Sequence, residues 1–119
     1  MSGTSARLSD RFFGFTTDEI PGATIVVCTG RLILENVPLF RSDIKAMFGS
    51  GKRVILDLDG VTHIDSSGIG ALAQLYVSSK SAGCHLQLYH LSAPVKRLLG
   101  ITKLLDAFEA AGSHLTRLP

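Results

Sequence analysis

The chain has 119 residues, the length of one ordinary domain, and 45% of them are apolar, which is typical of a globular fold with a buried core. The formal net charge is only +2, and no run of lysine and arginine marks a nucleic-acid interface, so we expect no direct nucleic-acid partner. No apolar stretch reaches the roughly 20 residues of a membrane-spanning helix, and the two cysteines lack metal-ligand spacing. These features predict a cytoplasmic protein with reduced thiols and with neither a membrane span nor a metal site.

The chain begins with the polar residues 1–10, which predict a flexible N-terminal tail before a single domain over 11–119. Short segments rich in β-branched or alternating apolar residues predict strands at 11–17, 23–29, 53–58 and 85–91. Apolar residues at helical spacing predict helices at 36–48, at 67–82 and from Ser92 onward. Segment 104–108 fits either a short helix or a last edge strand.

Strands and helices alternate over 54–99, and this order predicts helices packed on a sheet with some parallel pairs. The predicted fold class is therefore α/β, one domain with a mixed β-sheet of about five strands and three to four helices packed on it. Asn36 is the predicted N-cap of the first helix. Ile69, Leu72, Ala73 and Tyr76 are predicted to form the buried stripe of the second.

The stretch Asp65-Ser66-Ser67-Gly68 lies where the strand ending at Leu58, after a short link over 59–64, passes into the second helix. Free N–H groups and the helix dipole favour an anion at such a terminus by about 0.3–1 kcal/mol. A phosphoserine would bring about −1.5 to −2 charges there. We therefore interpret the stretch as a phosphorylation site, with an ordinary N-cap as the alternative.

The residues around the serines predict how the modified surface would behave. Gly68 and Gly70 lack side chains and would let a kinase or a partner backbone approach closely. Asp57, Asp59 and Asp65 are near in sequence, so an added phosphate is expected to create a strongly acidic patch. Phosphorylation is then expected to change the surface that a partner meets and to leave the fold largely unchanged.

An enzyme active site is a weaker interpretation of the same residues. A hydrolase that uses Ser66 or Ser67 would be expected to carry the Gly-x-Ser-x-Gly elbow, and the glycine before the serine is missing here. No histidine of the four can be assigned as a base from the sequence, and the phosphate-binding loop Gly-x-x-x-x-Gly-Lys-[Ser/Thr] is absent. We therefore predict no catalytic residues and no cofactor.

The segments around this motif resemble a known family. Val54-Ile55-Leu56-Asp57-Leu58, the run from Asp65 to Leu72, the stretch 88–99 and the earlier segment 25–30 are together similar to the STAS domain of anti-sigma factor antagonists, over about residues 12–110. The resemblance implies a binding protein that captures an anti-sigma factor, itself a serine kinase, and so releases a sigma factor for transcription. It also implies that the kinase phosphorylates the family's serine with ATP, and that a phosphatase acting on phosphoserine reverses the step.

By position in the motif, the resemblance assigns Ser67 as the phosphate acceptor, Ser66 as its neighbour at the cap and Asp65 as a contact residue. The partner-binding residues it implies are Asp65, Ser66, Ser67, Gly68 and Ile69. The sequence departs from the family at Ile33, which stands about where the family often carries an acid; Glu35 follows two residues later. An alternative function is a STAS scaffold or interaction subunit of a stress-signalling or lipid-transport complex, without sigma regulation.

Overall fold

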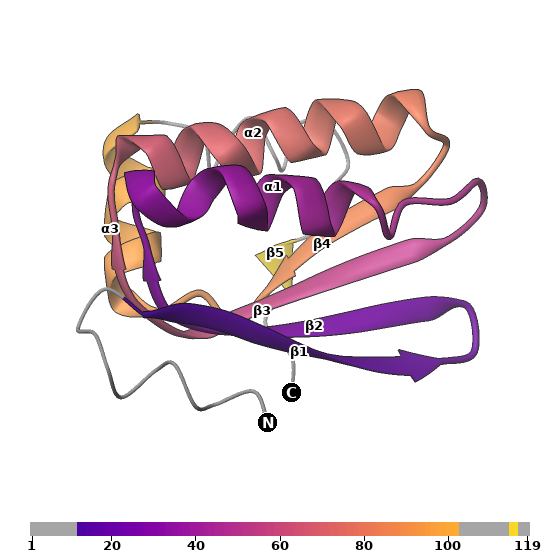
Figure 1. Cartoon of the computed structure of the whole chain (residues 1–119), viewed down its shortest axis with the longest axis horizontal. Helices are drawn as coiled ribbons and strands as arrows, with labels where there is room; N and C mark the ends of the chain where they lie inside the picture. The colour runs from indigo at the N-terminus through magenta and orange to yellow at the C-terminus, as the bar shows by residue number, and fades with distance from the viewer. Residues whose placement is uncertain (1–11, 103–114, 117–119) are drawn as a thin grey trace.

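The computed structural model describes residues 12–102 and 115–116 (Figure 1). Within these residues a single sheet has the strand order β1-β2-β3-β4-β5. The strands are β1 (Phe13–Ile20), β2 (Ala23–Leu32), β3 (Arg53–Ile64), β4 (His85–Tyr89) and β5 (Leu115–Thr116). The helices are a 3-10 turn η2 (Leu34–Asn36), then α1 (Val37–Lys45), α2 (Ser66–Ser81) and α3 (Ala93–Thr102). The predicted segment 104–108 and the predicted tail 1–10 lie outside the described residues.

The sheet is mixed, which confirms the predicted α/β class. β1 and β2 pair antiparallel, whereas β2, β3, β4 and β5 pair parallel in succession. The β1–β2 hairpin closes through Pro21 and Gly22, and Gly22 has φ +79°, a conformation that favours glycine. Both hairpin strands continue about three residues beyond their predicted ends, because each finds a hydrogen-bonding partner in the other or in β3.

The central strand β3 corrects the predicted link over 59–64. It runs without interruption from Arg53 to Ile64, because β2 accompanies it as far as the pair Leu32↔Ile64. At two register shifts, between Val27 and Thr29 and between Gly30 and Arg31 of β2, β3 carries one extra residue each time. A Cβ on Gly60 would lie 2.7 Å from the Cys28 carbonyl oxygen, so only glycine allows the two strands this close. The strand therefore delivers the chain directly to the start of α2.

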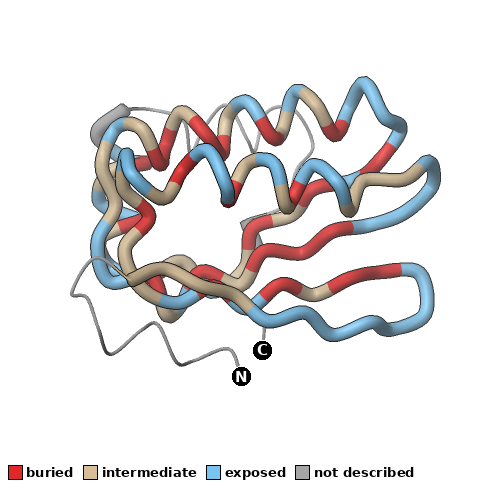
Figure 2. Tube along the Cα trace, in the orientation of Figure 1, coloured by how far each residue is buried: buried red, intermediate tan, exposed pale blue. Residues whose placement is uncertain are grey.

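Helices α1 and α2 lie side by side over one face of the sheet, and the buried residues line the layer between them (Figures 1 and 2). The fully buried side chains include Phe40 and Ile44 from α1, Leu72 and Leu75 from α2, and Leu56 from β3. In the predicted stripe of α2, Ile69 and Leu72 are buried, but Ala73 and Tyr76 are only half-buried. Ala71 and Leu75 complete the buried face in their place.

Helix α1 is shorter than predicted and is not capped by the side chain of Asn36. The Asn36 amide instead donates to the Arg31 carbonyl oxygen at 2.7 Å, while the turn η2 leads directly into the helix. Cys28 and Cys84 are buried free thiols, and burial, with a contribution from Asp57, raises the pKa of Cys28 to about 12. None of the described helices is long and apolar enough to cross a membrane.

Candidate functional site

The N-terminus of α2 is capped by Asp65, one residue earlier than a serine cap would require. Asp65 is extended, with φ −116° and ψ −174°, and its Oδ1 accepts a hydrogen bond from the Gly68 backbone N–H at 3.0 Å. An aspartate at this position satisfies one of the N–H groups that a helix start leaves without an internal partner. Ser66 and Ser67 therefore occupy the first two positions of the helix itself.

Asp65 also ties the start of α2 to the segment after β2. Its second oxygen, Oδ2, accepts from the Leu34 backbone N–H at 3.0 Å, and its own N–H donates to the Leu32 carbonyl oxygen at 3.4 Å. The predicted contact residue thus uses both carboxylate oxygens within its own chain. This connection spans 31 residues of sequence, so no local pattern could have predicted it.

The two serines differ in exposure. Ser66 is exposed and Ser67 is half-buried, and neither hydroxyl takes part in a hydrogen bond with another described residue. Their backbone N–H groups belong to the first turn, where helices offer donors to an anion. The site therefore presents two hydroxyls at the positive end of a 16-residue helix.

Glycines 68 and 70 have different roles, and the prediction for Gly68 is wrong. Gly68 is buried; a Cβ there would collide with the Leu32 carbonyl oxygen and lie 2.7 Å from Cγ1 of Ile64. Its missing side chain lets α2 pack against the end of β2 and leaves no room for a partner. A Cβ added to Gly70, by contrast, would have no other atom within 4 Å, so the space beside this residue is open.

Ile69, which is predicted as a partner contact, is buried in this structure. Ile69 is 3% exposed and packs in the hydrophobic core, because it faces the sheet from the first turn of α2. Together with the burial of Gly68, this limits the accessible side chains of the motif to Ser66, Ser67 and part of Asp65.

The expected acidic patch is smaller than predicted. β3 stays extended to Ile64, and each strand residue adds about 3.3 Å of length. Asp57 and Asp59 therefore lie on the order of 20 Å from Asp65. Exposed charges so far apart are largely screened, since the Debye length is about 8 Å at physiological ionic strength. Asp57 instead binds the Asp59 N–H at 3.1 Å and contacts His90 at 3.1 Å.

The segment between β2 and α1 lies next to the site through Leu34. Ile33, the residue that departs from the family pattern, is half-buried, and its carbonyl oxygen accepts from Asn36 N–H at 2.8 Å and from Val37 N–H at 3.1 Å. Glu35 is exposed on the turn η2. An acidic residue therefore stands on this turn two residues after Ile33.

Two histidines of the described chain contact residues other than the two serines. The described residues contain no group of three side chains that could hold a metal ion. His63 contacts the Thr62 hydroxyl at 3.0 Å, and His90 contacts Asp57, so neither of these histidines is a partner of Ser66 or Ser67.

Substitutions at His90 test the left-handed backbone conformation of this residue. It has φ +53°, a left-handed conformation that costs a side chain roughly 1 kcal/mol, and its ring holds Asp57. His90→Gly and His90→Ala both lose the ring contact, but only glycine relieves the backbone. We expect the glycine variant to have the higher free energy of unfolding, by about 1 kcal/mol, in urea denaturation. An alanine variant that equals or exceeds it in stability would contradict this conformation.

Comparison with known proteins agrees with this architecture. Residues 15–116 match the model of the STAS domain family. A candidate anti-sigma factor antagonist from Thermotoga maritima has 26% sequence identity and a TM-score of 0.69, over 77% of this chain and 80% of that one. The anti-sigma factor antagonist SpoIIAA, in its unphosphorylated form, has a TM-score of 0.63 over 89% of this chain and 90% of that one; at 16% identity this likeness shows the fold alone.

A second kind of protein carries the same fold. The murine solute carrier 26 family member A9, an anion transporter, has a region with 25% identity and a TM-score of 0.74, covering 96% of this chain but only 22% of the transporter chain. STAS domains are generally non-catalytic regulatory domains. Because the family match extends over most of the sequence, the chain belongs to the STAS domain family.

Proposed function

We propose that the protein is an anti-sigma factor antagonist that is switched off by phosphorylation of Ser67. In its unmodified form it binds an anti-sigma factor that is also a serine kinase, and so frees a sigma factor for transcription in the cytoplasm. The kinase phosphorylates Ser67 with ATP and the complex dissociates. A phosphatase that acts on phosphoserine restores the binding form. The protein is the substrate and has no catalytic residues of its own.

The observation that carries this proposal is the position of Ser67 in the first turn of α2, with a hydroxyl that makes no hydrogen bond to another described residue. A kinase needs a hydroxyl that it can reach, and a phosphate at this position meets free N–H groups and the positive end of the helix dipole. The likeness to the Thermotoga maritima protein, at 26% identity, supports the same role.

The phosphate is expected to act on the partner surface and not on the fold. At the start of α2 it gains about 0.3–1 kcal/mol from the helix dipole, which offsets repulsion from the neighbouring Asp65. It adds about −1.5 to −2 charges to a surface that already presents Glu35. A partner that binds the uncharged serines in close contact would have to desolvate that charge, and binding is weakened.

The first test is phosphate transfer. Incubation with the cognate kinase and ATP is expected to add one phosphate, and Ser67→Ala is expected to abolish the transfer, as measured by intact mass and phosphopeptide mapping. Ser66→Ala is the matched control, because it removes the adjacent hydroxyl and should still accept phosphate. If Ser67→Ala accepts phosphate as well as the unchanged protein does, the assignment of Ser67 fails.

The second test is binding to the same kinase. Ser67→Asp places a carboxylate at the acceptor and is expected to weaken the complex by about tenfold or more, whereas Ser67→Ala should bind with nearly unchanged affinity. Calorimetry with the purified kinase measures both. Equal affinity of the aspartate and alanine variants would argue against a charge-based switch.

A second candidate is a STAS scaffold that serves a stress-signalling or lipid-transport complex without sigma regulation. The observation in its favour is the fold match to the region of the anion transporter, at a TM-score of 0.74. Affinity purification of the tagged protein from its own cells, followed by identification of the untagged proteins that copurify, distinguishes the two functions. Recovery of a kinase and a sigma factor supports the antagonist, whereas recovery of transport components with binding that ignores Ser67→Asp supports the scaffold.

A further inference from the structure

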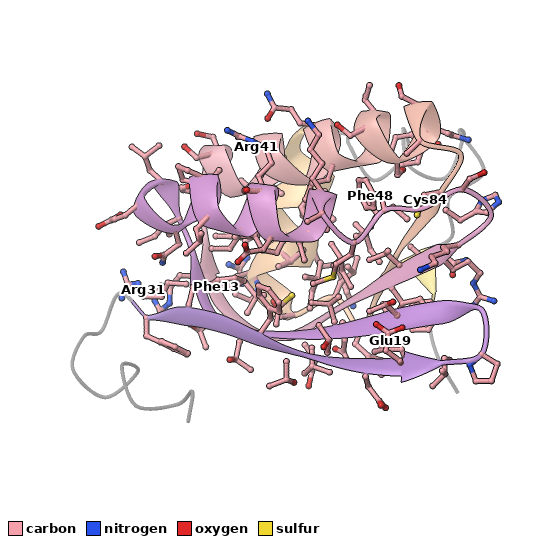
Figure 3. The ribbon with its side chains drawn as sticks, turned by 45° about the vertical axis from the view of Figure 1, so that its right-hand side comes forward. Phe13, Glu19, Arg31, Arg41, Phe48 and Cys84 are labelled. Atoms are coloured by element: carbon pink, nitrogen blue, oxygen red, sulfur yellow. The ribbon has the colours of Figure 1, made fainter. Side chains whose placement is uncertain are left out.

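A shallow groove runs between α1 and α2 on the surface that faces away from the sheet. It has a volume of about 440 Å³ and is lined by Arg41, Lys45, Ala73, Gln74, Val77 and Ser78. Figure 3 labels Arg41 on α1, and its Nη1 donates to Oε1 of Gln74 across the groove at 3.0 Å. The groove is thus formed by two helices that the core holds in a fixed relation.

Among the residues that the structure describes, the groove carries positive charge without a counter-charge. No carboxylate is among its lining residues, and neither Arg41 nor Lys45 forms an ion pair within the described part of the chain. The nearest acid on the same helix, Asp43, lines a different pocket on the other flank of α1, beside Phe13 and Leu39.

The groove also offers an apolar contact. Val77 is 63% exposed, and Ala73 is half-buried one turn before it. Helical spacing continues this stripe through Gly70, which is open to solvent, to Ser66 at the start of α2. The surface therefore extends from the groove to the N-terminus of the helix.

We propose that this groove binds an acidic amphipathic helix of a partner protein. Arg41 and Lys45 are four residues apart on α1, so their Cα atoms are about 6 Å apart along the helix axis. Two carboxylates four residues apart on a partner helix have the same spacing, and an apolar side chain between them would cover Val77. This docking surface does not depend on phosphorylation of Ser67 and would add contact area outside the motif.

The test uses an alanine-based helical peptide that carries two glutamates four residues apart and a leucine between them. Titration into the ¹⁵N-labelled full chain is expected to shift the amide signals of Gln74, Val77 and Ser78. Replacing both glutamates of the peptide with lysine should abolish the shifts. Raising the salt from about 0.1 M to about 1 M shortens the Debye length from about 10 Å to about 3 Å and should weaken binding strongly.

The matched variants are a charge reversal inside the groove and one outside it. Arg41→Glu with Lys45→Glu is expected to weaken peptide binding by about tenfold or more, and the milder Arg41→Gln with Lys45→Gln to weaken it in the same direction. Lys96→Glu with Arg97→Glu, at exposed positions of α3, changes the net charge equally and should have less than about a twofold effect. Thermal melts confirm that each variant is folded.

Three outcomes would overturn the proposal. Equal losses in the groove and α3 variants would show that only net charge matters. Shifts confined to residues outside the groove would place the peptide elsewhere. Binding to vesicles that contain phosphatidylserine, lost in the groove variants while the peptide fails to bind the unchanged protein, would identify a lipid surface as the occupant instead of a helix.

Discussion

Replacing Gly68 with valine is expected to lower the free energy of unfolding by about 3 kcal/mol or more, which is a large part of the stability of a domain of this size. The new Cβ would collide with the Leu32 carbonyl oxygen and lie 2.7 Å from Cγ1 of Ile64. The obstacle includes backbone, and that backbone is fixed because Leu32 and Ile64 pair in the parallel ladder. Relief would therefore require α2 to move away from the end of the sheet.

The control for this prediction is the other glycine of the motif. Gly70 lies in the same helix but has open space at its Cβ, so Gly70→Ala should gain helix propensity without a clash and stabilise the protein by about 0.5–1 kcal/mol. Gly68→Ala should instead destabilise it, since overpacking costs about 1–3 kcal/mol. Urea midpoints of the three variants test the signs. A stabilising Gly68→Ala would show that the assumed contact with Leu32 does not exist.

Gly68→Ala also shows whether this glycine serves the stability of the fold or the binding of a partner. If the glycine were present to admit a partner, Gly68→Ala would keep its stability and lose binding. The structure predicts the reverse order, in which the fold suffers first because the glycine faces its own chain. Gly70→Ala is the variant that can alter recognition at unchanged or improved stability, because its methyl group would point to solvent beside Ser66 and Ser67.

The alternation of apolar residues was sufficient to predict the class of the fold, the mixed sheet and the second helix to within one residue at each end. The length of β3 could not be predicted this way, because Asp59 and Gly60 are typical of turns. They remain in the strand because β2 pairs with that part of β3 and a register shift accommodates them. Local composition does not contain that information, which belongs to a neighbouring strand about thirty residues away.

The candidate site shows the same division. The start of a helix beside Ser67 followed from the residue types around it, but the contacts of its neighbours did not. That Asp65 would bind Leu34, and that Gly68 would face Leu32, depends on how the end of β2 meets the start of α2. The predicted proximity of Asp57 to the serines failed for a related reason, since sequence distance is a poor guide along an extended strand.

Asp65→Ala is expected to destabilise the protein by about 2 kcal/mol. The helix cap to Gly68 N–H contributes about 1 kcal/mol, and the hydrogen bond to Leu34 N–H contributes about 1 kcal/mol more, since both acceptors are charged. Asp59→Ala is the matched control. It removes an exposed carboxylate near the end of β3 whose oxygens accept no hydrogen bond from another described residue. We therefore expect it to change the free energy of unfolding by less than about 0.5 kcal/mol.

Removing the Asp65 carboxylate should loosen the structure locally as well as lower the global free energy of unfolding, because this side chain joins the start of α2 to the turn after β2. Hydrogen exchange is expected to accelerate at the amides of Leu34 and Gly68 in Asp65→Ala, while the core amides of β3 change only with global stability. Asp65→Asn keeps an oxygen for one of the two donors and should protect one amide at most. If exchange at Leu34 were unaffected in both variants, the connection between α2 and the turn after β2 would not exist.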